Sequence, residues 1–245
     1  MRTTLILKLK FDRRNFMICY GKFEFAYDIL SVQQEVSLLL KNEIWLAHYN
    51  QAQYTGEWTA LPLRSPNGEV TNPIAESLFK LEFKDTPLLQ TLPSVRQLMQ
   101  NLKCDRLSAR LLNLKAGAII KPHKDHDLSF ENGEARLHFP IFTNEKVRFY
   151  LENDLLEMGE GECWYINANL THQVFNDGPT DRIHLVVDCK VNNWLTNFFS
   201  AATLTSREQK KDTAQLLQVI SELKLQNTPT TNALAAQLSK ELDHE

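Results

Sequence analysis

Four polar residues in the middle of the chain have the types and the order expected of a metal site. His123 and Asp125 flank one residue in the stretch Pro-His-Lys-Asp, His172 lies in a later segment, and Arg182 follows it. Two imidazoles and one carboxylate form the ligand set of non-haem Fe(II) sites, which leave coordination positions open for a cosubstrate and O2. The arginine adds a planar pair of donors for a carboxylate. The sequence therefore predicts iron-dependent oxygen chemistry.

The spacing of His123 and Asp125 suits a β-strand. Side chains two residues apart in a strand project from the same face, so both donors can reach one metal ion. A neutral imidazole and an ionised carboxylate also favour a divalent metal over a proton at neutral pH. We expect His172 to be the third ligand, because it opens a strand-like segment after the turn at residues 167–169.

Two further pairs have an arginine two residues before a histidine, namely Arg136 with His138 and Arg182 with His184. By the same alternation, each arginine and its histidine face one side of their strand. A dicarboxylic cosubstrate such as 2-oxoglutarate chelates iron through its 2-oxo acid end, and its distal carboxylate then needs a buried counter-charge. An unpaired buried carboxylate is costly in free energy. Arginines near the metal ligands therefore indicate a 2-oxoglutarate pocket.

Each of these residues taken alone has a simpler interpretation. A histidine and an aspartate separated by one residue are often polar surface, and a lone strand histidine is more often a hydrogen-bonded core residue. His48 and His244 have no comparable context, so we expect ordinary surface or partly buried side chains there. The aromatic pair Phe149-Tyr150 is expected to pack in the core. The joint arrangement of imidazoles, carboxylate and arginine favours the metal site.

The elements that must hold these residues are short strands. Turn signals separate closely spaced strand-like segments from Leu107 to Val191, a pattern typical of a sandwich or barrel rather than of βαβ units. The expected strands are 107–114, 119–125, 136–143, 147–151, 162–167, 172–176 and 182–189. We predict a mainly β fold with flanking helices, whose core is a jelly-roll with helices packed outside one sheet.

The two ends of the chain differ from this middle part. The elements expected before it are strands at 3–10 and 58–63 and helices at 28–41 and 94–102. Residues 206–226 carry an apolar helical stripe, Pro229 follows it, and residues 232–242 form a second predicted helix. We expect a domain at 1–200 and a two-helix appendage at 201–245. The appendage is expected to brace the outer sheet, with dimerisation or binding of a partner protein as the alternative.

The composition argues against several classes of partner. Hydrophobic residues make up 43% of the chain and charged residues 23%, and the formal net charge is -3, so neither nucleic acid nor an anionic membrane is an expected partner. No apolar run approaches the about 18 residues of a membrane-spanning helix. The four scattered cysteines are expected to be reduced, and the charged N-terminus does not resemble a signal peptide. We expect a cytoplasmic protein.

The block from Leu111 to Leu195 contains a series of motifs. They read Ala-Gly-Ala-Ile-Ile-Lys-Pro-His-Lys-Asp at 116–125, Arg-Leu-His-Phe-Pro-Ile at 136–141, Gly-Glu-Cys-Trp-Tyr-Ile-Asn at 161–167, Thr-His-Gln-Val-Phe-Asn-Asp at 171–177 and Asp-Arg-Ile-His-Leu-Val-Val-Asp at 181–188. In these stretches, and more weakly at 58–66, the chain resembles the aspartyl/asparaginyl β-hydroxylase family of Fe(II)/2-oxoglutarate-dependent dioxygenases. That family includes bacterial proline cis-4-hydroxylase-like enzymes.

The resemblance implies a double-stranded β-helix, the jelly-roll of cupin-like proteins. The iron ligands that it implies are His123, Asp125 and His172. It further implies that Arg182 binds the distal carboxylate of 2-oxoglutarate, and that Arg136 and His138 lie near the cosubstrate's iron-binding end. The implied cofactor is Fe(II), with 2-oxoglutarate and O2 as cosubstrates.

The implied activity is hydroxylation of a C–H bond in an amino acid that is free, carrier-bound or peptidyl and resembles Asp, Asn or Pro, with 2-oxoglutarate converted to succinate and CO2. Animal peptidyl hydroxylases of this family have glycine at the position of Asp125 and serine at that of Leu112, so this chain is more similar to the bacterial small-molecule branch. Arg64, Lys124 and Asp127 are candidates for binding charged groups of the substrate.

Two other functions fit parts of the pattern. A non-catalytic, cupin-like protein could bind a metal or a small acid, although simple metal binding does not need the two arginines. A hydrolase could hold zinc with the same three ligands. Competition by 2-oxoglutarate separates the hydrolase from the dioxygenase, because zinc-dependent hydrolysis needs no 2-oxo acid.

Overall fold

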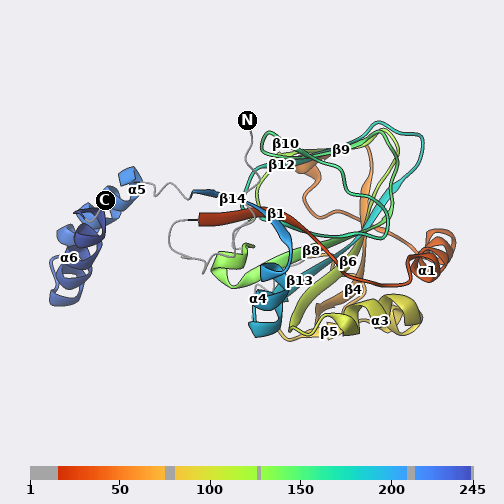
Figure 1. Ribbon diagram of the computed structural model, residues 1–245, viewed down its shortest axis with the longest axis horizontal. Helices are drawn as coiled ribbons and strands as arrows, with labels where there is room; N and C mark the ends of the chain where they lie inside the picture. The colour runs from red at the N-terminus through yellow and green to blue at the C-terminus, as the bar shows by residue number, and fades with distance from the viewer. Residues whose placement is uncertain (1–15, 75–80, 126–127, 209–212, 244–245) are drawn as a thin grey trace. The chain divides into compact units, whose positions relative to one another are not determined.

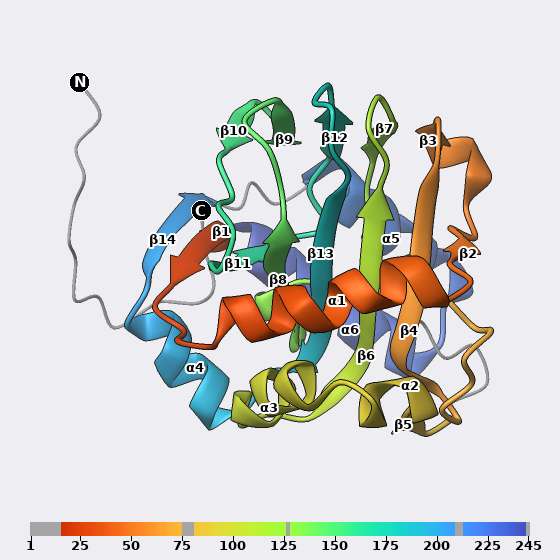
Figure 2. The same cartoon turned by 90° about the vertical axis from the view of Figure 1, so that its right-hand side faces the viewer.

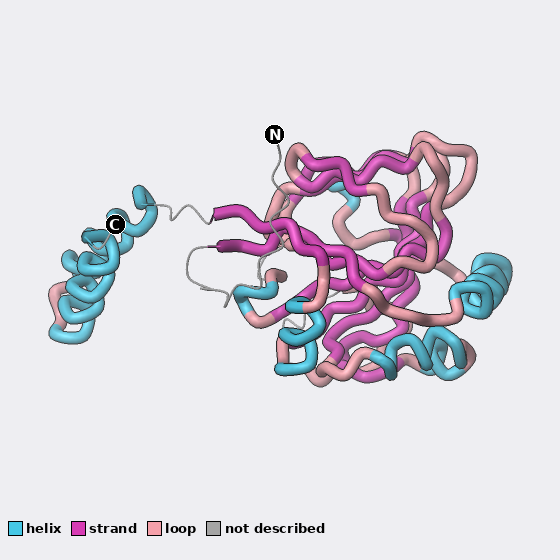
Figure 3. The backbone as a smooth tube through the Cα atoms, viewed as in Figure 1, coloured by secondary structure: helices cyan, strands magenta, loops and turns pink. Residues whose placement is uncertain are grey.

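The computed structural model of the chain describes residues 16–74, 81–125, 128–208 and 213–243. The chain divides into two compact units, one formed by Ile18–Ser206 and a second that contains α5 (Thr213–Gln226) and α6 (Pro229–Asp243). Antiparallel strands of the first unit form two sheets, drawn as two magenta layers in Figure 3. In the second unit α5 and α6 pack against each other, and Ile220 and Ala235 are buried.

The larger sheet provides one wall of the candidate site. Its strands lie in the order β14 (Thr203–Glu208), β1 (Phe16–Phe23), β11 (Cys163–Ile166), β8 (Glu134–Phe142), β13 (Arg182–Lys190), β6 (Arg106–Leu114), β4 (Trp58–Pro66) and β2 (Leu46–Ala47), with β5 (Phe83–Asp85) paired to β4. The two longest ladders join β13 to β8 and to β6, both antiparallel. Most of its strands are labelled in Figure 1, and β11 and β2 are labelled in Figure 2.

The smaller sheet provides the opposite wall. Its order is β10 (Asp154–Leu156), β9 (Val147–Leu151), β12 (His172–Asn176), β7 (Ile119–His123) and β3 (Tyr54–Thr55). From β6 to β13 the chain passes repeatedly between the two sheets, which is the connectivity of a jelly-roll. The predicted fold class, mainly β with a jelly-roll core, flanking helices and C-terminal helices, is confirmed.

Helices cover the outer face of the larger sheet, as α1 does in Figure 2. The helical elements of the first unit are α1 (Ile29–Asn42), α2 (Pro87–Gln90), α3 (Pro93–Asn101) and α4 (Asn193–Ser200), with short 3-10 helices η1 (Gln51–Gln53) and η2 (Phe130–Asn132). Asp28 caps α1, because its carboxylate accepts a hydrogen bond from the backbone N–H of Ser31. The apolar stripe Val32, Val36 and Leu39 is buried against the sheet and ties α1 to the core.

Three central strands of the larger sheet, β6, β8 and β13, are buried on both faces, and the two faces differ in chemistry. The helix-facing side is apolar and belongs to the main core, with Leu111, Leu137, Phe139 and Leu185. The alternate residues Arg110, Arg136, His138 and Arg182 line a cavity between the sheets. Period-two alternation thus gives each strand an apolar side for the core and a polar side for the cavity.

Most of the predicted elements are present, but the structure also contains short elements that were not predicted, among them β2, β3, β5, β10 and α2. Residues 206–208 were expected to begin a helix, but they end strand β14, and the helix begins at Thr213. Thr203 and Thr205 are β-branched, which suits a strand beside β1. Strand β1 and helix α4 were not predicted at all. The strand expected at 3–10 lies outside the described residues.

None of the helices in the described part of the chain combines the length and the apolar character that crossing a membrane requires.

Candidate active site

The three predicted metal ligands lie together between the sheets. His123 ends β7 and His172 begins β12, and the two residues are partners in the β7–β12 ladder, with ring centroids 4.1 Å apart. One donor atom from each of His123, Asp125 and His172 lies within 4.8 Å of the others. The strand predicted at 119–125 ends at His123, so Asp125 lies just beyond it. A hydrogen bond of 2.9 Å from the backbone N–H of Asp125 to the carbonyl of Ala168 fixes that position.

Both histidines of this cluster are held with one ring nitrogen free for a metal. Nδ1 of His123 lies 2.8 Å from the carbonyl oxygen of Lys121, and Nδ1 of His172 lies 3.0 Å from that of Leu170. A carbonyl only accepts, so each Nδ1 carries the proton and each Nε2 keeps its lone pair. Burial, reinforced by the neighbouring His123, lowers the pKa of His172 to about 4. His172 is therefore neutral at pH 7, as a metal ligand must be.

Asp125 is oriented by a buried arginine. Arg136 forms an ion pair through Nη1 with Oδ2 of Asp125, and it also donates to Asp188 from Nε at 2.7 Å and from Nη2 at 3.1 Å. Burial opposes ionisation of Asp125, but the surrounding positive groups, of which Arg136 contributes most, together outweigh burial and lower the pKa of that carboxyl to about 2. Asp188 in turn accepts a hydrogen bond of 2.7 Å from Ser108. A buried polar chain thus holds the carboxylate of the cluster ionised.

Arg182 is the next charged group along the cavity, and it has no carboxylate partner among the described residues. Its Nη2 lies 2.9 Å from Nδ1 of His184, its guanidinium lies 5.7 Å from the ring of Phe149, and its Nε has no partner. Burial alone lowers its pKa to about 9. A buried guanidinium without an anion costs free energy, so Arg182 is suited to a carboxylate that the described residues do not supply.

His138 is a second buried polar side chain of the cavity with unpaired atoms. Both of its ring nitrogens are buried, and neither has a hydrogen-bond partner in the described part of the chain. Burial, with the charges of Arg182 and Arg136 nearby, lowers the pKa of His138 well below its usual value, so the ring is neutral. Buried polar atoms normally have partners, and a cavity lined by such orphaned atoms is typical of a ligand site.

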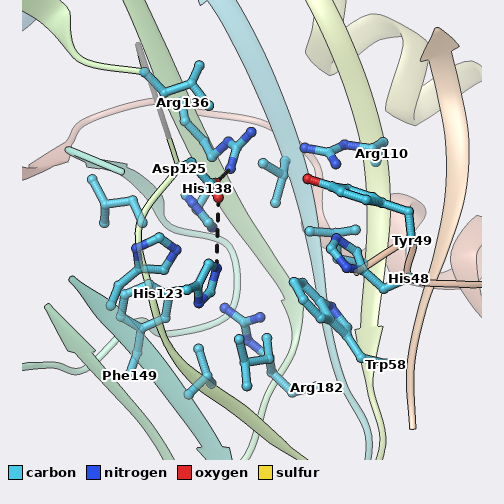
Figure 4. Close-up of a pocket in the computed structure, with 17 residues that line it drawn as sticks. His48, Tyr49, Trp58, Arg110, His123, Asp125, Arg136, His138, Phe149 and Arg182 are labelled. Carbon is cyan, nitrogen blue, oxygen red and sulfur yellow. Dashed lines mark hydrogen bonds and ion pairs between the residues drawn. The ribbon is translucent and has the colours of Figure 1, made fainter. Parts of the chain in front are cut away.

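The cavity also contains residues that the sequence analysis did not select. Its further polar and aromatic lining consists of His48, Tyr49, Trp58, Arg110 and Phe149 (Figure 4). The expectation for His48 was wrong, because it is 4% exposed and its ring stacks on Trp58 with centroids 3.5 Å apart. The expectation for Phe149 was incomplete, since its buried ring also lines the cavity.

Neither of the two substrate-binding candidates that the structure describes, Arg64 and Lys124, lines this cavity. Arg64 is engaged elsewhere, through Nη1 with Asp85 at 2.7 Å and through Nε with the carbonyl of Arg106 at 2.8 Å. Lys124 is exposed and is absent from the lining. Asp127 lies outside the described residues. Of the candidates in the described part of the chain, only the metal ligands and the arginine–histidine pairs are therefore brought together.

The donor set fits Fe(II). Two imidazoles and one carboxylate on one side leave the remaining coordination positions open. The orphaned guanidinium of Arg182 in the same cavity fits an acidic cosubstrate. A family model described as aspartyl/asparaginyl beta-hydroxylase matches residues 28–192, well over half of the chain. The chain belongs to the aspartyl/asparaginyl β-hydroxylase family. It is thus an enzyme of a 2-oxoglutarate-dependent hydroxylase family.

Two curated relatives are amino-acid hydroxylases. This β-hydroxylase family member is 28% identical over 205 residues to an L-proline cis-4-hydroxylase of Rhizobium meliloti (strain 1021), a match that covers 83% of this chain and 69% of the relative. It is 25% identical over 137 residues to L-proline cis-3-hydroxylase 2 of a Streptomyces species, covering 54% of this chain and 47% of that protein.

Among the solved structures that the chain matches is a prolyl-4-hydroxylase of Pseudomonas putida. That structure aligns with a TM-score of 0.44 and 11% sequence identity, and the match covers 72% of this β-hydroxylase family member and 94% of the other chain.

Proposed function

We propose that this protein is an Fe(II)/2-oxoglutarate-dependent dioxygenase that hydroxylates a C–H bond of an amino acid, free, carrier-bound or peptidyl and of Asp, Asn or Pro type. The observation that carries the proposal is the buried guanidinium of Arg182, which has no carboxylate partner among the described residues and lies in the cavity of the His123, Asp125 and His172 donors. A plain metal-binding protein or a zinc hydrolase has no use for that arginine. The proline hydroxylases among the relatives support an amino acid as the substrate class.

In this proposal His123, Asp125 and His172 hold the iron. Their Nδ1 hydrogen bonds and the Arg136 ion pair orient the donors before the metal arrives, so little conformational freedom is lost on binding. The resemblance implied a place for Arg136 at the iron-binding end of the cosubstrate. Because its described partners are Asp125 and Asp188, we assign it the positioning of Asp125.

Arg182 binds the distal carboxylate of 2-oxoglutarate. A guanidinium matches a carboxylate with two parallel hydrogen bonds, and in this buried position it also neutralises the negative charge. His138, neutral and unpartnered, offers a ring N–H to the cosubstrate. Apolar side chains including Phe149 and Val174 line the cavity between these residues and exclude water.

When bound, Fe(II) supplies the oxidising chemistry with O2, by which one oxygen atom enters the substrate C–H bond and the other enters 2-oxoglutarate, which becomes succinate and CO2. The protein's own contribution is orientation and a dry, charged cavity. His172 stays neutral, Asp125 stays ionised, and Arg182 fixes the far end of the cosubstrate.

The test is succinate formation by the purified protein with Fe(II), ascorbate and 2-oxoglutarate, first without and then with a panel of free and peptidyl amino acids. Wild type is expected to release succinate slowly alone and faster with its substrate, and His172→Ala is expected to release none above background. The exposed Arg148→Gln variant serves as the matched control. Equal succinate release by wild type and His172→Ala would contradict the proposal, and 2-oxoglutarate binding without turnover would indicate a binding protein.

A further inference from the structure

The turn at residues 167–170 connects β11 to β12 and contacts two of the three metal ligands through its backbone. The carbonyl of Ala168 accepts a hydrogen bond of 2.9 Å from the N–H of Asp125. The carbonyl of Leu170 lies 3.0 Å from Nδ1 of His172. The place of the carboxylate and the direction of the imidazole therefore both depend on the shape of this turn.

Asn167 gives the turn its shape. It is completely buried, with 0% of its surface exposed. Its Oδ1 accepts a hydrogen bond of 3.1 Å from the N–H of Asn169, and its own carbonyl accepts one of 3.0 Å from the N–H of Leu170. An asparagine that bonds the backbone two residues further on stabilises a tight turn. These bonds span the stretch of backbone that carries the Ala168 and Leu170 carbonyls.

Asn167 also attaches the turn to β1. Its Nδ2 donates to the carbonyl of Ile18 at 3.1 Å, and its backbone N–H donates to that of Cys19 at 2.8 Å. Because Oδ1 faces an N–H and Nδ2 faces a carbonyl, only one orientation of the amide satisfies both partners. Ile18 and Cys19 are themselves buried, at 3% and 0% exposed. The turn is therefore anchored to a buried part of the larger sheet.

The segment that follows Asp125 is fastened to the same elements. The N–H of Leu128 donates to Oδ1 of Asn169 at 3.2 Å, and Glu131 in η2 accepts a hydrogen bond of 2.7 Å from the N–H of Ile18. Ile18 thus gives its N–H to this segment and its carbonyl to the turn. Hydrogen bonds link Asp125, Leu128 and Glu131 to the turn or to the strand that anchors it, so a change in the turn also reaches the segment that carries Asp125.

We propose that Asn167 is a positioning residue of the iron centre, and that it acts through the turn at 167–170 on Asp125 and His172. Asn167 does not line the cavity, so it acts only through other residues. The inference rests on the proposed function, because it concerns the metal that these two ligands are proposed to hold. Without the Asn167 amide the turn gains conformational freedom, and metal binding must then order the ligands at a cost in entropy. Loss of a residue that orients metal ligands typically weakens metal binding about 10- to 100-fold.

Asn176→Ala is the matched control for Asn167→Ala. Asn176 is also 0% exposed, and its Nδ2 donates to the backbone carbonyls of Leu114 at 3.0 Å and Thr180 at 2.9 Å. It lies at the opposite end of β12 from His172. Both variants lose a buried amide with backbone partners, and urea unfolding measures how much stability each of them loses. A purely structural role for Asn167 therefore predicts similar behaviour of the two variants.

The first measurement is the affinity of the folded, full-length protein for Co(II), a stable stand-in for Fe(II). Asn167→Ala is expected to bind Co(II) about 10- to 100-fold more weakly than wild type. Asn176→Ala is expected to stay within about threefold of wild type, because its bonds do not reach the turn. Equal losses in the two variants, or wild-type affinity in Asn167→Ala, overturn the inference.

The second measurement is the visible absorption spectrum of bound Co(II), which depends on the number and geometry of its ligands. At saturating Co(II) the spectrum of Asn167→Ala is expected to differ from that of wild type, whereas the spectrum of Asn176→Ala is expected to coincide with it. A residue that only adds stability leaves both spectra unchanged, and that result overturns the inference.

Asn169→Ala is the milder variant if Asn167→Ala does not fold, because Asn169 is only partly buried. It removes the bond to Leu128 and is expected to weaken Co(II) binding about threefold or more, the equivalent of about one hydrogen bond. Wild-type affinity in folded Asn169→Ala then overturns the inference. Absence of Co(II) binding by wild type contradicts the proposed function itself and removes the inference with it.

Discussion

Arg136 binds Asp125 through Nη1 while its Nε and Nη2 hold Asp188, so the carboxylate of the metal cluster is fixed by a residue that is itself fixed. Burial disfavours the charge of Arg136, yet Asp188 and Asp125 raise its pKa above the usual value. The guanidinium therefore stays charged under all working conditions. Asp125 reaches its ionised, oriented state before any metal binds.

Replacing Arg136 is expected to weaken metal binding. In Arg136→Gln, Asp125 loses its ion pair and Asp188 loses its strongest partner, so the donor geometry relaxes. Loss of such an outer-sphere partner typically reduces metal affinity about 10- to 100-fold. Calorimetric titration with Fe(II) or Mn(II) under anaerobic conditions measures the effect.

The matched control for Arg136 is Arg148→Gln. Arg148 also pairs with a carboxylate, Asp177 at 2.5 Å, but that pair is exposed and lies outside the cavity. Exposed pairs contribute little, so metal affinity should stay within about twofold of wild type. Similar metal affinities for the two variants would contradict the positioning of Asp125 by Arg136.

Arg182→Gln is expected to weaken 2-oxoglutarate binding without a change in metal affinity. The charge-assisted contact to the distal carboxylate accounts for roughly 10- to 100-fold in the dissociation constant. The matching change in the ligand is 2-oxobutyrate, which keeps the 2-oxo acid and lacks the distal carboxylate that Arg182 is proposed to bind. Wild type should discriminate strongly between the two acids in a thermal-shift titration. The Arg182→Gln variant should hardly discriminate, and retained discrimination would refute this role.

The sequence was sufficient for most strands between Leu107 and Val191 and for the residues that share a strand face. Arg136 and His138 do share the cavity face of β8, and Arg182 contacts His184, as two-residue alternation predicts. The metal cluster could also be predicted, because His123 and Asp125 are close in sequence. The one difference concerns the backbone: the strand was expected to include Asp125, but it ends at His123 and Asp125 lies in the following loop.

The other side of the cavity could not be predicted, for physical reasons. Arg110 follows Leu107-Ser-Ala and precedes Leu111-Leu112, which reads as an ordinary buried strand. Its cavity-facing direction is decided by which face of β6 meets the helices, and that is a property of the assembled sandwich. His48 follows a two-residue strand, and its burial depends on Trp58 from a neighbouring strand. Neither feature has a local sequence signal.

Arg64 is expected to be dispensable for activity. It is bound to Asp85 and to the Arg106 carbonyl and does not line the cavity. Arg64→Gln should therefore release succinate within about twofold of wild type, with and without substrate. Its partly exposed ion pair contributes about 1 kcal/mol or less to the free energy of unfolding. A tenfold loss of substrate-stimulated succinate in this variant would restore Arg64 as a substrate-binding residue.

His48 should make the metal-free protein less stable as the pH falls. Burial, with the charge of Arg110 nearby, lowers its folded-state pKa to about 3, whereas an unfolded histidine titrates near about 6.5. Between these values the unfolded state binds a proton that the folded state does not. Above pH of about 6.5 His48 therefore does not reduce the free energy of unfolding. As the pH falls from there toward 3, the free energy of unfolding decreases progressively.

The measurement is urea unfolding of wild type and His48→Gln at several pH values between 8.5 and 5. Below pH of about 6 the free energy of unfolding should fall more steeply with decreasing pH in wild type than in the variant, because the variant lacks one titrating group. The two slopes should differ by about 1.4 kcal/mol per pH unit. Between pH 7.5 and 8.5 His48 is neutral in both states, so the two slopes should coincide there. Parallel slopes down to pH 5 would mean that His48 is protonated in the folded protein, which its stacking on Trp58 and its 4% exposure argue against.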